Sequence, residues 1–548
     1  MRRIVIVGGV AGGASAAARA RRLDERARIV VFERGPDVSF ANCGLPYYVG
    51  GVIAPREKLL VSTAERLRDR FAIDVRTRCE VVAIDRAAKR VRFRTADGTE
   101  GEEPYDALVL SPGAAPLRPP LPGIDDPRVM VLRNLADVDR IKAAVDGGVH
   151  RAVVVGAGFI GLELVENLVH RGVATTLVEL QDQVLPPFDR ELTTPLVAAV
   201  RAAGVEVLLG ESAEAFESGG DGLTVRLKSG RKLPADVVVL GIGVRPENAL
   251  AVAAGLEVGP RGGIRVDAAM RTSDPSILAC GDCVETTDAV FGAPTQVPLA
   301  GPANRQGRIA ADTACGRGSA YRGTQGTAIV GAFGKTLAMT GATEKALGRC
   351  GIPFARAWVH PAHHATYYPG AEPMSLKLLF APEGGRVLGA QAVGGAGVDK
   401  RIDVLAMAIQ AGMNVQDLEQ AELCYAPQYG SAKDPVNMVG FVAAGLLRGD
   451  HPQVGVDALG GEGPAPLVLD VRTAQEHAKG AIPGAVNVPV DELRARLGEL
   501  PRDRPIVTYC QVGMRGYLAT RILLQSGFPA TSNLGGGYTT WRLHHPEA

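Results

Sequence analysis

The sequence predicts an α/β protein with two Rossmann-like nucleotide-binding domains and a separate compact α/β domain at its C-terminal end. The first observation is a strand, a glycine-rich turn, a helix and a second strand that ends at an acidic residue, a pattern found near residue 4 and again near residue 152. The second is a change in composition after about residue 445, where glycines accumulate before a new strand.

Composition sets the broad class of the protein. With 548 residues and 46% apolar content, the chain is long enough for three or four domains, each with its own core. Its 60 Lys and Arg nearly balance its 59 Asp and Glu, so the net charge of +1 gives no general reason to expect nucleic acid or a membrane surface as a partner. Eight cysteines without the dense spacing of a secreted scaffold indicate a reducing compartment, and we expect a cytoplasmic protein.

The N-terminal residues superficially resemble an export signal, because Met1-Arg2-Arg3 precedes a short apolar stretch. Charged residues between Arg19 and Asp24 follow too soon for a signal, and a strand, turn and helix explain the same letters. No segment offers about 18 uninterrupted apolar residues, so we expect no membrane span.

The first nucleotide motif begins with the apolar run Ile4-Val5-Ile6-Val7 and continues through the glycine-rich residues 8–13 into an Ala- and Arg-rich helix. Glycines permit a tight turn and the close approach of a pyrophosphate to the helix N-terminus. The middle glycine of the usual G-x-G-x-x-G is replaced by Val10, which weakens the motif taken alone. A second strand, 29–32, leads to Glu33, whose carboxylate suits a ribose diol, so we expect an adenine dinucleotide here.

The second nucleotide motif has all three glycines. Strand 152–155 leads to Gly156-Ala157-Gly158-Phe159-Ile160-Gly161, and a later strand, 175–178, ends at Glu179. A carboxylate at this position accepts hydrogen bonds from a ribose 2′-hydroxyl and repels a 2′-phosphate, which favours NADH over NADPH. Arg171 could soften that preference, so NADPH stays possible.

Later segments of the sequence complete the two predicted nucleotide-binding domains. Residues 107–114 close the first nucleotide region, and residues 241–246 close the second. The run Ile277-Leu278-Ala279-Cys280-Gly281-Asp282 resembles the segment in which flavin disulfide reductases use an aspartate to hold the ribityl chain of the flavin. The FAD domain is therefore predicted to be split around an inserted NAD domain.

The expected domains follow from these motifs. They are an FAD-binding domain in two parts, 1–115 and 246–324, an NAD-binding domain, 116–245, an α+β domain, 325–446, a linker, 447–462, and the C-terminal domain, 463–548. The α+β domain contains the strand-like run 375–380, and in the flavin reductase superfamily that this chain resembles, the equivalent domain makes a homodimer.

Two cysteines, Cys280 and Cys283, form a C-x-x-C, a spacing found in thioredoxin-like dithiols and in halves of zinc sites. No matching second pair follows, and Gly281-Asp282 already has a flavin role, so we favour packing and expect no metal site. The same interpretation was extended to the remaining unassigned cysteines, which are Cys79, Cys315, Cys350 and Cys424.

Cys43 lies in the run Ser39-Phe40-Ala41-Asn42-Cys43-Gly44, and the next cysteine is Cys79. A redox site with an internal disulfide needs two neighbouring thiols, so this lone thiol is predicted to pair with a thiol or sulfur compound from outside. The alternative is a buried, inert thiol. An attacking thiolate requires a lowered pKa, which we expect from helix or cationic surroundings.

The run Ser39 to Cys43 resembles the signature of coenzyme A disulfide reductases, the single-cysteine branch of the flavin- and pyridine-nucleotide-dependent disulfide reductases, and the similarity covers about residues 1–445. The resemblance implies FAD and NADH as cofactors and attack by Cys43 on a coenzyme A disulfide or persulfide. The residues expected to contact cofactors are Gly8, Ala11, Gly12, Glu33, Arg34, Gly113, Asp282, Gly156, Gly158, Ile160, Gly161, Glu179 and Gly243.

The same resemblance assigns substrate contacts to Ser15, Arg19, Arg22, Ser39 and Asn42. Arg19 and Arg22 are three residues apart on one helical face, where two guanidinium groups could clamp the phosphates of coenzyme A. A solvated basic face is the alternative.

Tyrosines complete the predicted redox site. Tyr425, together with Tyr367 or Tyr368, matches tyrosines that members of the resembled family present from the partner subunit. A phenol there could donate a proton or a hydrogen bond to the leaving thiolate, or the side chain could simply pack. The sequence does not decide between Tyr367 and Tyr368.

The C-terminal domain has its own cysteine motif. Strand 505–509 ends at Cys510-Gln511-Val512-Gly513-Met514-Arg515-Gly516, a loop that opens a helix and aims backbone N–H groups at the sulfur. These residues, with Asp470-Val471-Arg472 and Ile482-Pro483-Gly484-Ala485, resemble a rhodanese domain. The resemblance implies that Cys510 is catalytic and that Arg515 binds the substrate. The four residues between them suit sulfur transfer, since related phosphatases have a longer loop. His477 is expected to be structural, and a catalytically inactive rhodanese fold is the alternative.

Together the two thiols predict a reductase of coenzyme A persulfide, polysulfide and disulfide, in which Cys510 relays sulfane sulfur to Cys43. An NADH oxidase or peroxidase with a Cys43 sulfenic acid is the main alternative. Peroxidase-type relatives carry a histidine in the first glycine loop, where this chain has Ala11. A sulfur-carrier or redox-sensing protein is a third possibility.

Overall fold

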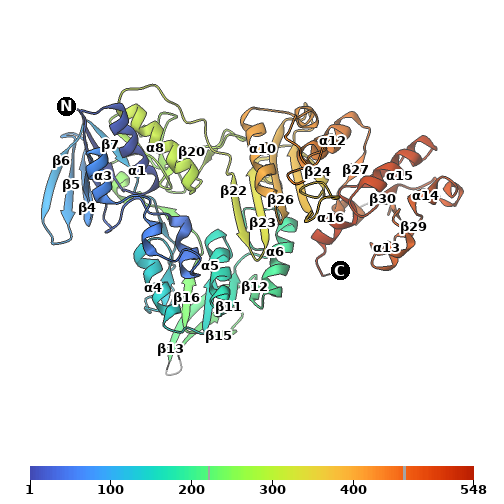
Figure 1. Ribbon diagram of the computed structural model, residues 1–548, viewed down its shortest axis with the longest axis horizontal. Helices are drawn as coiled ribbons and strands as arrows, with labels where there is room; N and C mark the ends of the chain where they lie inside the picture. The colour runs from blue at the N-terminus through green and yellow to red at the C-terminus, as the bar shows by residue number, and fades with distance from the viewer. Residues whose placement is uncertain (220–221, 461–464, 548) are drawn as a thin grey trace. The chain divides into compact units, whose positions relative to one another are not determined.

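A computed structural model describes residues 1–219, 222–460 and 465–547 of the chain, which divides into two compact units (Figure 1). Unit 1 comprises Met1–Asp182 and Ala203–Thr324, and unit 2 comprises Gln183–Ala202 and the chain from Gln325 onward. Residues 461–464 of the predicted linker and of the start of the C-terminal domain lie outside the described residues.

The first sheet of unit 1 is parallel, with strand order β19-β7-β1-β2-β3. Its strands are β1 (Arg3–Val7), β2 (Arg28–Phe32), β3 (Asp74–Arg76), β7 (Ala107–Leu110) and β19 (Ile277–Ala279). Strands β1, β2, β7 and β19 are nearly continuous apolar runs because both faces of the sheet are covered there. Helices α1 (Ala11–Leu23) and α8 (Ala300–Ala314) pack closely, and a Cβ on Gly307 would lie 2.2 Å from the carbonyl oxygen of Gly12.

The second sheet of unit 1 is also parallel, with strand order β12-β11-β10-β16-β9. Its elements are β9 (Val129–Val131), α4 (Leu135–Asp146), β10 (Arg151–Val155), α5 (Phe159–His170), β11 (Ala174–Glu179), β12 (Glu206–Leu209) and β16 (Val237–Leu240). In both sheets, each glycine motif lies between a central strand and the helix that follows it, so the carboxyl edges of the two sheets position the two predicted nucleotide sites.

Smaller elements complete unit 1. Two antiparallel sheets are formed by β4 (Cys79–Asp85), β5 (Arg90–Thr95) and β6 (Glu100–Pro104), and by β13 (Ala213–Gly219), β14 (Gly222–Leu227) and β15 (Lys232–Ala235). The others are η1 (Asn42–Gly44), α2 (Leu45–Val49), η2 (Arg56–Leu59), α3 (Ala64–Phe71), β8 (Ala114–Pro116), β17 (Val244–Pro246), α7 (Ala249–Ala253), β18 (Ile264–Arg265), β20 (Val284–Thr287) and β21 (Pro294–Thr295).

Unit 2 contains an antiparallel sheet with strand order β22-β23-β26-β25-β24, with α10 and α12 packed against it (Figure 1). Its elements are β22 (Ala328–Ala332), β23 (Lys335–Gly341), α9 (Glu344–Cys350), β24 (Ala355–Val359), β25 (Met374–Phe380), β26 (Val387–Gly394), α10 (Val398–Gln410), α11 (Val415–Glu419) and α12 (Pro435–Arg448). Helix α6 (Arg190–Ala202), which comes from the middle of the predicted NAD domain, packs on β23 and β26 of this sheet.

A buried lysine ties α6 to this sheet. The Lys377 side chain on β25 is 1% exposed, and its Nζ lies 2.8 Å from Asp189, 2.5 Å from Glu191 and 2.9 Å from Glu344. Asp189 also accepts a hydrogen bond from Gln391 Nε2 on β26 at 2.6 Å. Lys377 is the cation that these three carboxylates share. Its removal would leave them without a partner of opposite charge in a largely buried environment, which is costly.

The C-terminal domain has a parallel sheet of order β27-β31-β30-β28-β29. Its elements are β27 (Gln453–Val454), η3 (Val456–Leu459), β28 (Leu467–Asp470), α13 (Ala474–Ala478), β29 (Val486–Asn487), α14 (Val490–Leu493), η4 (Leu497–Glu499), β30 (Ile506–Tyr509), α15 (Met514–Gln525), β31 (Thr531–Leu534) and α16 (Gly537–His544). Strand β27 and η3 lie inside the segment predicted as a linker, 447–462.

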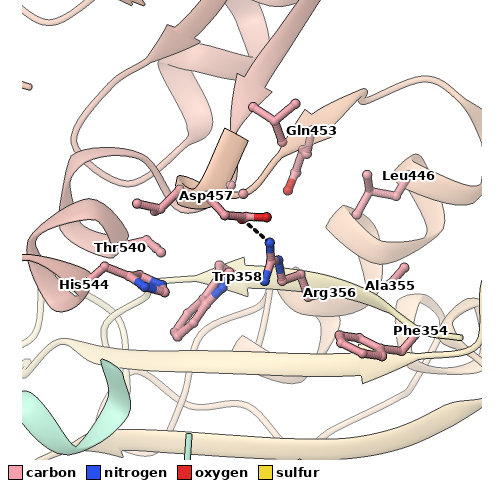
Figure 2. A pocket seen from close by; sticks show the side chains of 13 residues that line it. Phe354, Ala355, Arg356, Trp358, Leu446, Gln453, Asp457, Thr540 and His544 are labelled. Atoms are coloured by element: carbon pink, nitrogen blue, oxygen red, sulfur yellow. Dashed lines mark hydrogen bonds and ion pairs between the residues drawn. The ribbon is translucent and has the colours of Figure 1, made fainter. Parts of the chain in front are cut away.

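Polar contacts join this domain to the neighbouring sheet of unit 2 around a cavity of about 460 Å³ (Figure 2). Arg356 on β24 forms an ion pair with Asp457 of η3, and Figure 2 shows this pair beside Trp358 and His544. His360 Nε2 lies 2.7 Å from Thr540 Oγ1 on α16. The C-terminal domain is therefore held against β24 by specific side chains.

The cysteines only partly follow the packing interpretation. Cys79, Cys280 and Cys283 are buried and Cys315 is half-buried, but Cys350 and Cys424 are exposed, so the interpretation was wrong for those two. Cys350 is the last residue of α9, and Cys424 lies in the connection between α11 and α12, where neither side chain reaches a core. Among the described residues, no helix is both long and apolar enough to cross a membrane.

Replacement of Lys377 by alanine should lower the free energy of unfolding of unit 2 by about 3 kcal/mol, because it leaves buried carboxylates uncompensated. Tryptophan fluorescence during urea unfolding measures this effect, since both tryptophans, Trp358 and Trp541, belong to unit 2. Arg448→Ala, which breaks an exposed ion pair with Glu419, is the control and should cost at most about 1 kcal/mol. Equal losses in the two variants would show that the buried lysine does not stabilise the packing of α6.

Candidate functional sites

The two glycine turns in unit 1 have matching geometry. Gly8 and Gly156 have φ angles of +94° and +106°, and a Cβ at these positions would lie 2.1 Å from the carbonyl oxygen of Ser111 and 2.4 Å from that of Gly241. Each of these glycines begins its turn directly after a central strand, so both turns are possible only without a side chain at that position.

The last glycine of each motif is also required by the fold. A Cβ on Gly13 would lie 1.8 Å from the Gly8 carbonyl oxygen, and a Cβ on Gly161 would lie 2.0 Å from that of Gly156. The first turn of each helix therefore packs directly against its own glycine turn.

The middle position of the motif behaves differently. Gly158 has a φ of −77°, and no atom lies within 4 Å of the Cβ that a larger residue would carry. The fold itself does not require glycine at this position, which explains why the first turn tolerates Val10. The open space in front of Gly158 fits the close approach of a pyrophosphate to the N-terminus of α5.

The strand-end acids make equivalent contacts in the two domains. Glu33 accepts hydrogen bonds from the backbone N–H of Gly9 at 2.9 Å and of Gly35 at 2.8 Å. Glu179 accepts from the N–H of Ala157 at 2.7 Å and of Gln181 at 2.8 Å. Each carboxylate thus lies against its glycine turn, where it can also accept hydrogen bonds from a ribose. The glycine turn and the carboxylate together fit an adenine dinucleotide at both sites.

Other predicted cofactor contacts surround these turns. Gly113 and Gly243 have φ angles of +80° and +112° and precede the paired strands β8 and β17. Arg34 donates a 2.7 Å hydrogen bond to Glu247, so its guanidinium already has an internal partner. Arg171 is hydrogen-bonded to Asp146 and to the carbonyl oxygen of Val49.

Further predicted contacts lie on the same elements. Ala11 and Gly12 belong to the first turn of α1, and Ile160 is 41% exposed in the first turn of α5. Burial raises the pKa of Asp282, which follows β19. All of these cofactor contacts stay predictions.

Cys43 lies in the short helix η1, directly before α2, and is solvent-exposed. The surrounding protein raises the pKa of its thiol, first through partial desolvation and then through the charges of Glu163 and Asp282. The sequence led us to expect helix or cationic surroundings that lower this pKa. That expectation was wrong for the chain's own groups, because partial desolvation has the largest effect on this pKa and the charges that act on the thiol are those of carboxylates.

Glu163 and Tyr47 form a contact that the sequence did not predict. Tyr47 lies four residues after Cys43, and its hydroxyl donates a 3.2 Å hydrogen bond to Glu163 Oε1 on α5. Burial and the Glu163 charge raise the pKa of Tyr47 to about 12, and burial raises the pKa of Glu163. This contact links the helix of the second glycine turn to the Cys43 segment, and no spacing in the sequence signals it, because Tyr47 and Glu163 are 116 residues apart.

The predicted substrate contacts fall on two segments. Ser39, with a φ of +48°, and Asn42 belong to the Cys43 segment, and Asn42 Nδ2 donates a 3.1 Å hydrogen bond to the carbonyl oxygen of Arg133. Ser15, Arg19 and Arg22 lie on α1.

Two of the three predicted substrate residues on α1 already have partners within the chain. The Ser15 hydroxyl bonds Asn304, the Arg19 guanidinium donates to Asp312 at 2.8 Å, and Arg22 is exposed. Arg19 would have to share its guanidinium between Asp312 and a bound phosphate. The substrate contacts stay predictions.

The three tyrosines predicted for the redox site form one pair and one separate residue. The hydroxyls of Tyr367 and Tyr425 lie 2.6 Å apart, and the bond to Tyr425 raises the pKa of Tyr367. Both side chains are exposed. Tyr368 instead packs edge-on against the His364 ring. Tyr367 is therefore the better partner for Tyr425, and the catalytic role of the pair stays a prediction.

Cys510 lies at the end of β30 in a tightly supported loop. Its Sγ is 3.2 Å from the backbone N–H of Gly513, which donates to it, and the residue is 1% exposed. Asn533 Nδ2 on β31 donates a hydrogen bond to the Gly513 carbonyl oxygen at 3.0 Å. The backbone N–H of Tyr538 donates one to the Cys510 carbonyl oxygen at 2.8 Å. This loop can hold an anionic sulfur against a backbone donor.

Charged residues flank the Cys510 loop in pairs. The buried Asp470 accepts from Arg472, from the Tyr509 hydroxyl at 2.8 Å and from His477 Nδ1, which gives His477 a structural contact. Arg515 is paired with Glu476, at 2.8 Å from Nη1 and 2.6 Å from Nη2. The sequence motif pointed to Arg515 but gave no signal for its partner, Glu476.

Comparison with known families gives three matches along the chain. The family "pyridine nucleotide-disulphide oxidoreductase" matches residues 2–307, and its dimerisation domain matches residues 328–434. A rhodanese-like domain matches residues 456–544. The first match alone spans more than half of the chain.

Individual proteins are similar over most of the chain. A coenzyme A disulfide reductase from Staphylococcus aureus (strain JH9) is 35% identical over 446 residues, which cover 81% of this chain and 100% of the relative. The solved structure of reduced Bacillus anthracis CoADR-RHD is 47% identical, covers 100% of this chain and 98% of its own, and superposes with a TM-score of 0.97. An NAD-dependent persulfide reductase from A. fulgidus is 38% identical, covers 98% and 100%, and has a TM-score of 0.92.

Glu163→Gln should increase the reactivity of Cys43, because the Glu163 charge raises the pKa of the thiol and its removal lowers that pKa. More thiolate is then present at any pH below the thiol pKa, so the midpoint of iodoacetamide alkylation, followed on the Cys43 peptide by mass spectrometry, should move to lower pH. Glu102→Gln, which removes an exposed carboxylate paired with Arg90 in the same unit, is the matched control and should leave the midpoint unchanged. A midpoint that does not move in Glu163→Gln contradicts this electrostatic coupling.

Proposed function

The chain belongs to the pyridine nucleotide-disulphide oxidoreductase family, and we propose that it reduces coenzyme A persulfide, polysulfide and coenzyme A disulfide with electrons from NADH. The observation that carries the proposal is the lone, exposed thiol of Cys43, since the next cysteine in sequence, Cys79, is buried in the core. A redox thiol in this position must pair with sulfur from outside the chain. The similarity to a coenzyme A disulfide reductase and to a persulfide reductase supports this substrate class.

The cofactor sites follow from the two glycine turns. The turn at Gly8 with Glu33 and Asp282 would hold FAD, and the turn at Gly156 with Glu179 would hold NADH. When bound, these two cofactors supply the two-electron chemistry that the side chains of the protein lack. The carboxylate of Glu179 would repel a 2′-phosphate, and Arg171 is already engaged with Asp146, so NADH is the preferred donor.

Cys43 performs the covalent step. Its thiolate attacks the coenzyme A sulfur of the substrate, the substrate S–S bond breaks, and a Cys43–S–S–CoA mixed disulfide forms. The leaving group is hydrosulfide from a persulfide or coenzyme A thiolate from a disulfide, so charge is conserved. Arg19, Arg22 and Asn42 would bind the coenzyme A portion.

The paired tyrosines would act on the leaving group. The hydroxyls of Tyr367 and Tyr425 share a hydrogen bond, so one of them is oriented to donate outward to a thiolate. We propose that they act from the partner subunit of a homodimer, and the match of residues 328–434 to a dimerisation domain supports this assembly.

The rhodanese-like domain would supply sulfur. Cys510 is buried against a backbone N–H donor, an environment that suits an anionic persulfide. We propose that Cys510 carries sulfane sulfur and that coenzyme A or a related thiol transfers it to Cys43 for reduction to sulfide. The presence of both thiols in one chain favours a persulfide or polysulfide over a plain disulfide as the natural substrate.

Two serine variants test the two roles separately. Cys43→Ser should abolish NADH oxidation with coenzyme A disulfide, coenzyme A persulfide and polysulfide, because no mixed disulfide can form. Cys510→Ser should keep coenzyme A disulfide reduction but lower polysulfide turnover at least tenfold. The exposed Cys350→Ser is the matched control and should behave as wild type.

Different outcomes would support the alternatives. If Cys510→Ser leaves polysulfide turnover unchanged while Cys43→Ser abolishes it, the relay is wrong. If oxygen or peroxide is consumed with NADH faster than any coenzyme A compound, the protein is an oxidase or peroxidase. Slow turnover of every small substrate, together with persulfide-dependent capture of protein partners, would indicate a sulfur carrier.

A further inference from the structure

The Cys510 loop offers little net charge to a substrate. The four residues between Cys510 and Arg515 are Gln511, Val512, Gly513 and Met514, and none of them is ionisable. Arg515 is the cation of the motif, and both of its terminal nitrogens contact the two carboxylate oxygens of Glu476, at 2.8 and 2.6 Å. This bidentate geometry is the strongest that a guanidinium forms with a carboxylate.

Glu476 is fixed in place before any substrate arrives. It is the third residue of α13, and its Oε2 accepts 3.0 Å hydrogen bonds from both the backbone N–H and the hydroxyl of Thr473. The bonds to Arg515 and Thr473 lower the pKa of Glu476 to about 2, so it is charged throughout the neutral range. Glu476 therefore offsets the Arg515 charge, which also acts on the Cys510 thiol, before any anion arrives.

The second flanking cation is balanced in the same way. Arg472 is 2% exposed and forms a bidentate contact with Asp470, which is fully buried. Apolar side chains in the loop and in the first turns of the following helix are instead exposed to solvent. Val512 is 41%, Met514 73% and Leu518 46% exposed, and the last two lie four residues apart on one face of α15.

From this arrangement we propose that Glu476 is a specificity-determining residue that makes the Cys510 site select thiol-borne persulfides over inorganic thiosulfate. The inference rests on the proposed role of Cys510 as a sulfur carrier. Thiosulfate is a dianion, so its binding needs uncompensated positive charge, which Glu476 removes. The persulfide of a thiol such as coenzyme A presents an uncharged arm whose two methylenes lie next to the sulfur, and the exposed apolar side chains of Val512, Met514 and Leu518 suit these methylenes.

The two possible donors react by the same exchange. The Cys510 thiolate attacks the outer sulfur of R–S–SH, the S–S bond of the donor breaks, and the products are Cys510–S–SH and the thiolate R–S⁻. With thiosulfate, attack on the outer sulfur releases sulfite and leaves Cys510–S–S⁻. Neither exchange requires an external oxidant or reductant, so the donors differ only in charge and in the shape of the leaving group.

Steady-state sulfur transfer to cyanide by the full-length protein tests the proposal, with coenzyme A persulfide and thiosulfate as donors. Wild type should have the higher kcat/KM with coenzyme A persulfide. Glu476→Gln should increase the ratio of thiosulfate to persulfide kcat/KM about tenfold, mainly through KM for thiosulfate, because Arg515 gains a free charge. Glutamine also serves in a capping box, so α13 should stay folded.

Two further variants sharpen the test. Met514→Ser removes one of the exposed apolar side chains and should lower kcat/KM for coenzyme A persulfide several-fold more than for thiosulfate. Glu499→Gln breaks the surface pair with Arg496 in the same domain and, as the matched control, should leave the ratio unchanged. A wild-type enzyme that uses thiosulfate as efficiently as the persulfide, or a Glu476→Gln ratio equal to that of the control, overturns the proposal. Cys510→Ser separates the two claims, because full transfer activity in that variant would refute the carrier role itself.

Discussion

The glycine turn at residues 8–13 is the constraint on which the redox site depends. Its Gly9 backbone N–H donates to Glu33, and its Gly9 carbonyl oxygen accepts a 2.8 Å hydrogen bond from the backbone N–H of Ser39. One residue, Gly9, thus fixes both the strand-end acid and the start of the Cys43 segment through its backbone N–H and carbonyl groups. Since the turn exists only because Gly8 and Gly13 lack side chains, the nucleotide site and the thiol segment are built from the same backbone.

The two thiols sit in contrasting surroundings that suit different tasks. Cys43 is exposed at the surface of the chain. Partial desolvation, and then the charges of Glu163 and Asp282, raise the pKa of its thiol, so its reactivity depends on groups brought to it and on the state of Glu163. Cys510 is buried, with a backbone N–H donating to its sulfur and no ionisable residue before Arg515 in its loop. The first arrangement leaves room for a substrate to react, and the second is able to hold a sulfur atom after it has been transferred.

The sequence predicted the features that depend on local spacing. Both glycine turns, their strand-end acids and the loop from Cys510 to Arg515 follow from residues close together in the chain, and the predicted fold class was confirmed. Contacts between distant segments were not predictable. Helix α6 packs on the sheet of unit 2 through Lys377, Tyr47 meets Glu163, and Arg515 meets Glu476. These pairs are 186, 116 and 39 residues apart, and no spacing rule connects them.

Mass spectrometry of the intact, non-reduced protein tests the central claim most directly. After incubation with coenzyme A disulfide, we expect one coenzyme A per chain, located on the Cys43 peptide and lost when NADH is added. Cys43→Ser should carry no adduct. An unmodified Cys43, an oxygen adduct on Cys43 in place of coenzyme A, or a coenzyme A adduct that NADH does not remove would contradict the proposal that this lone thiol pairs with its substrate.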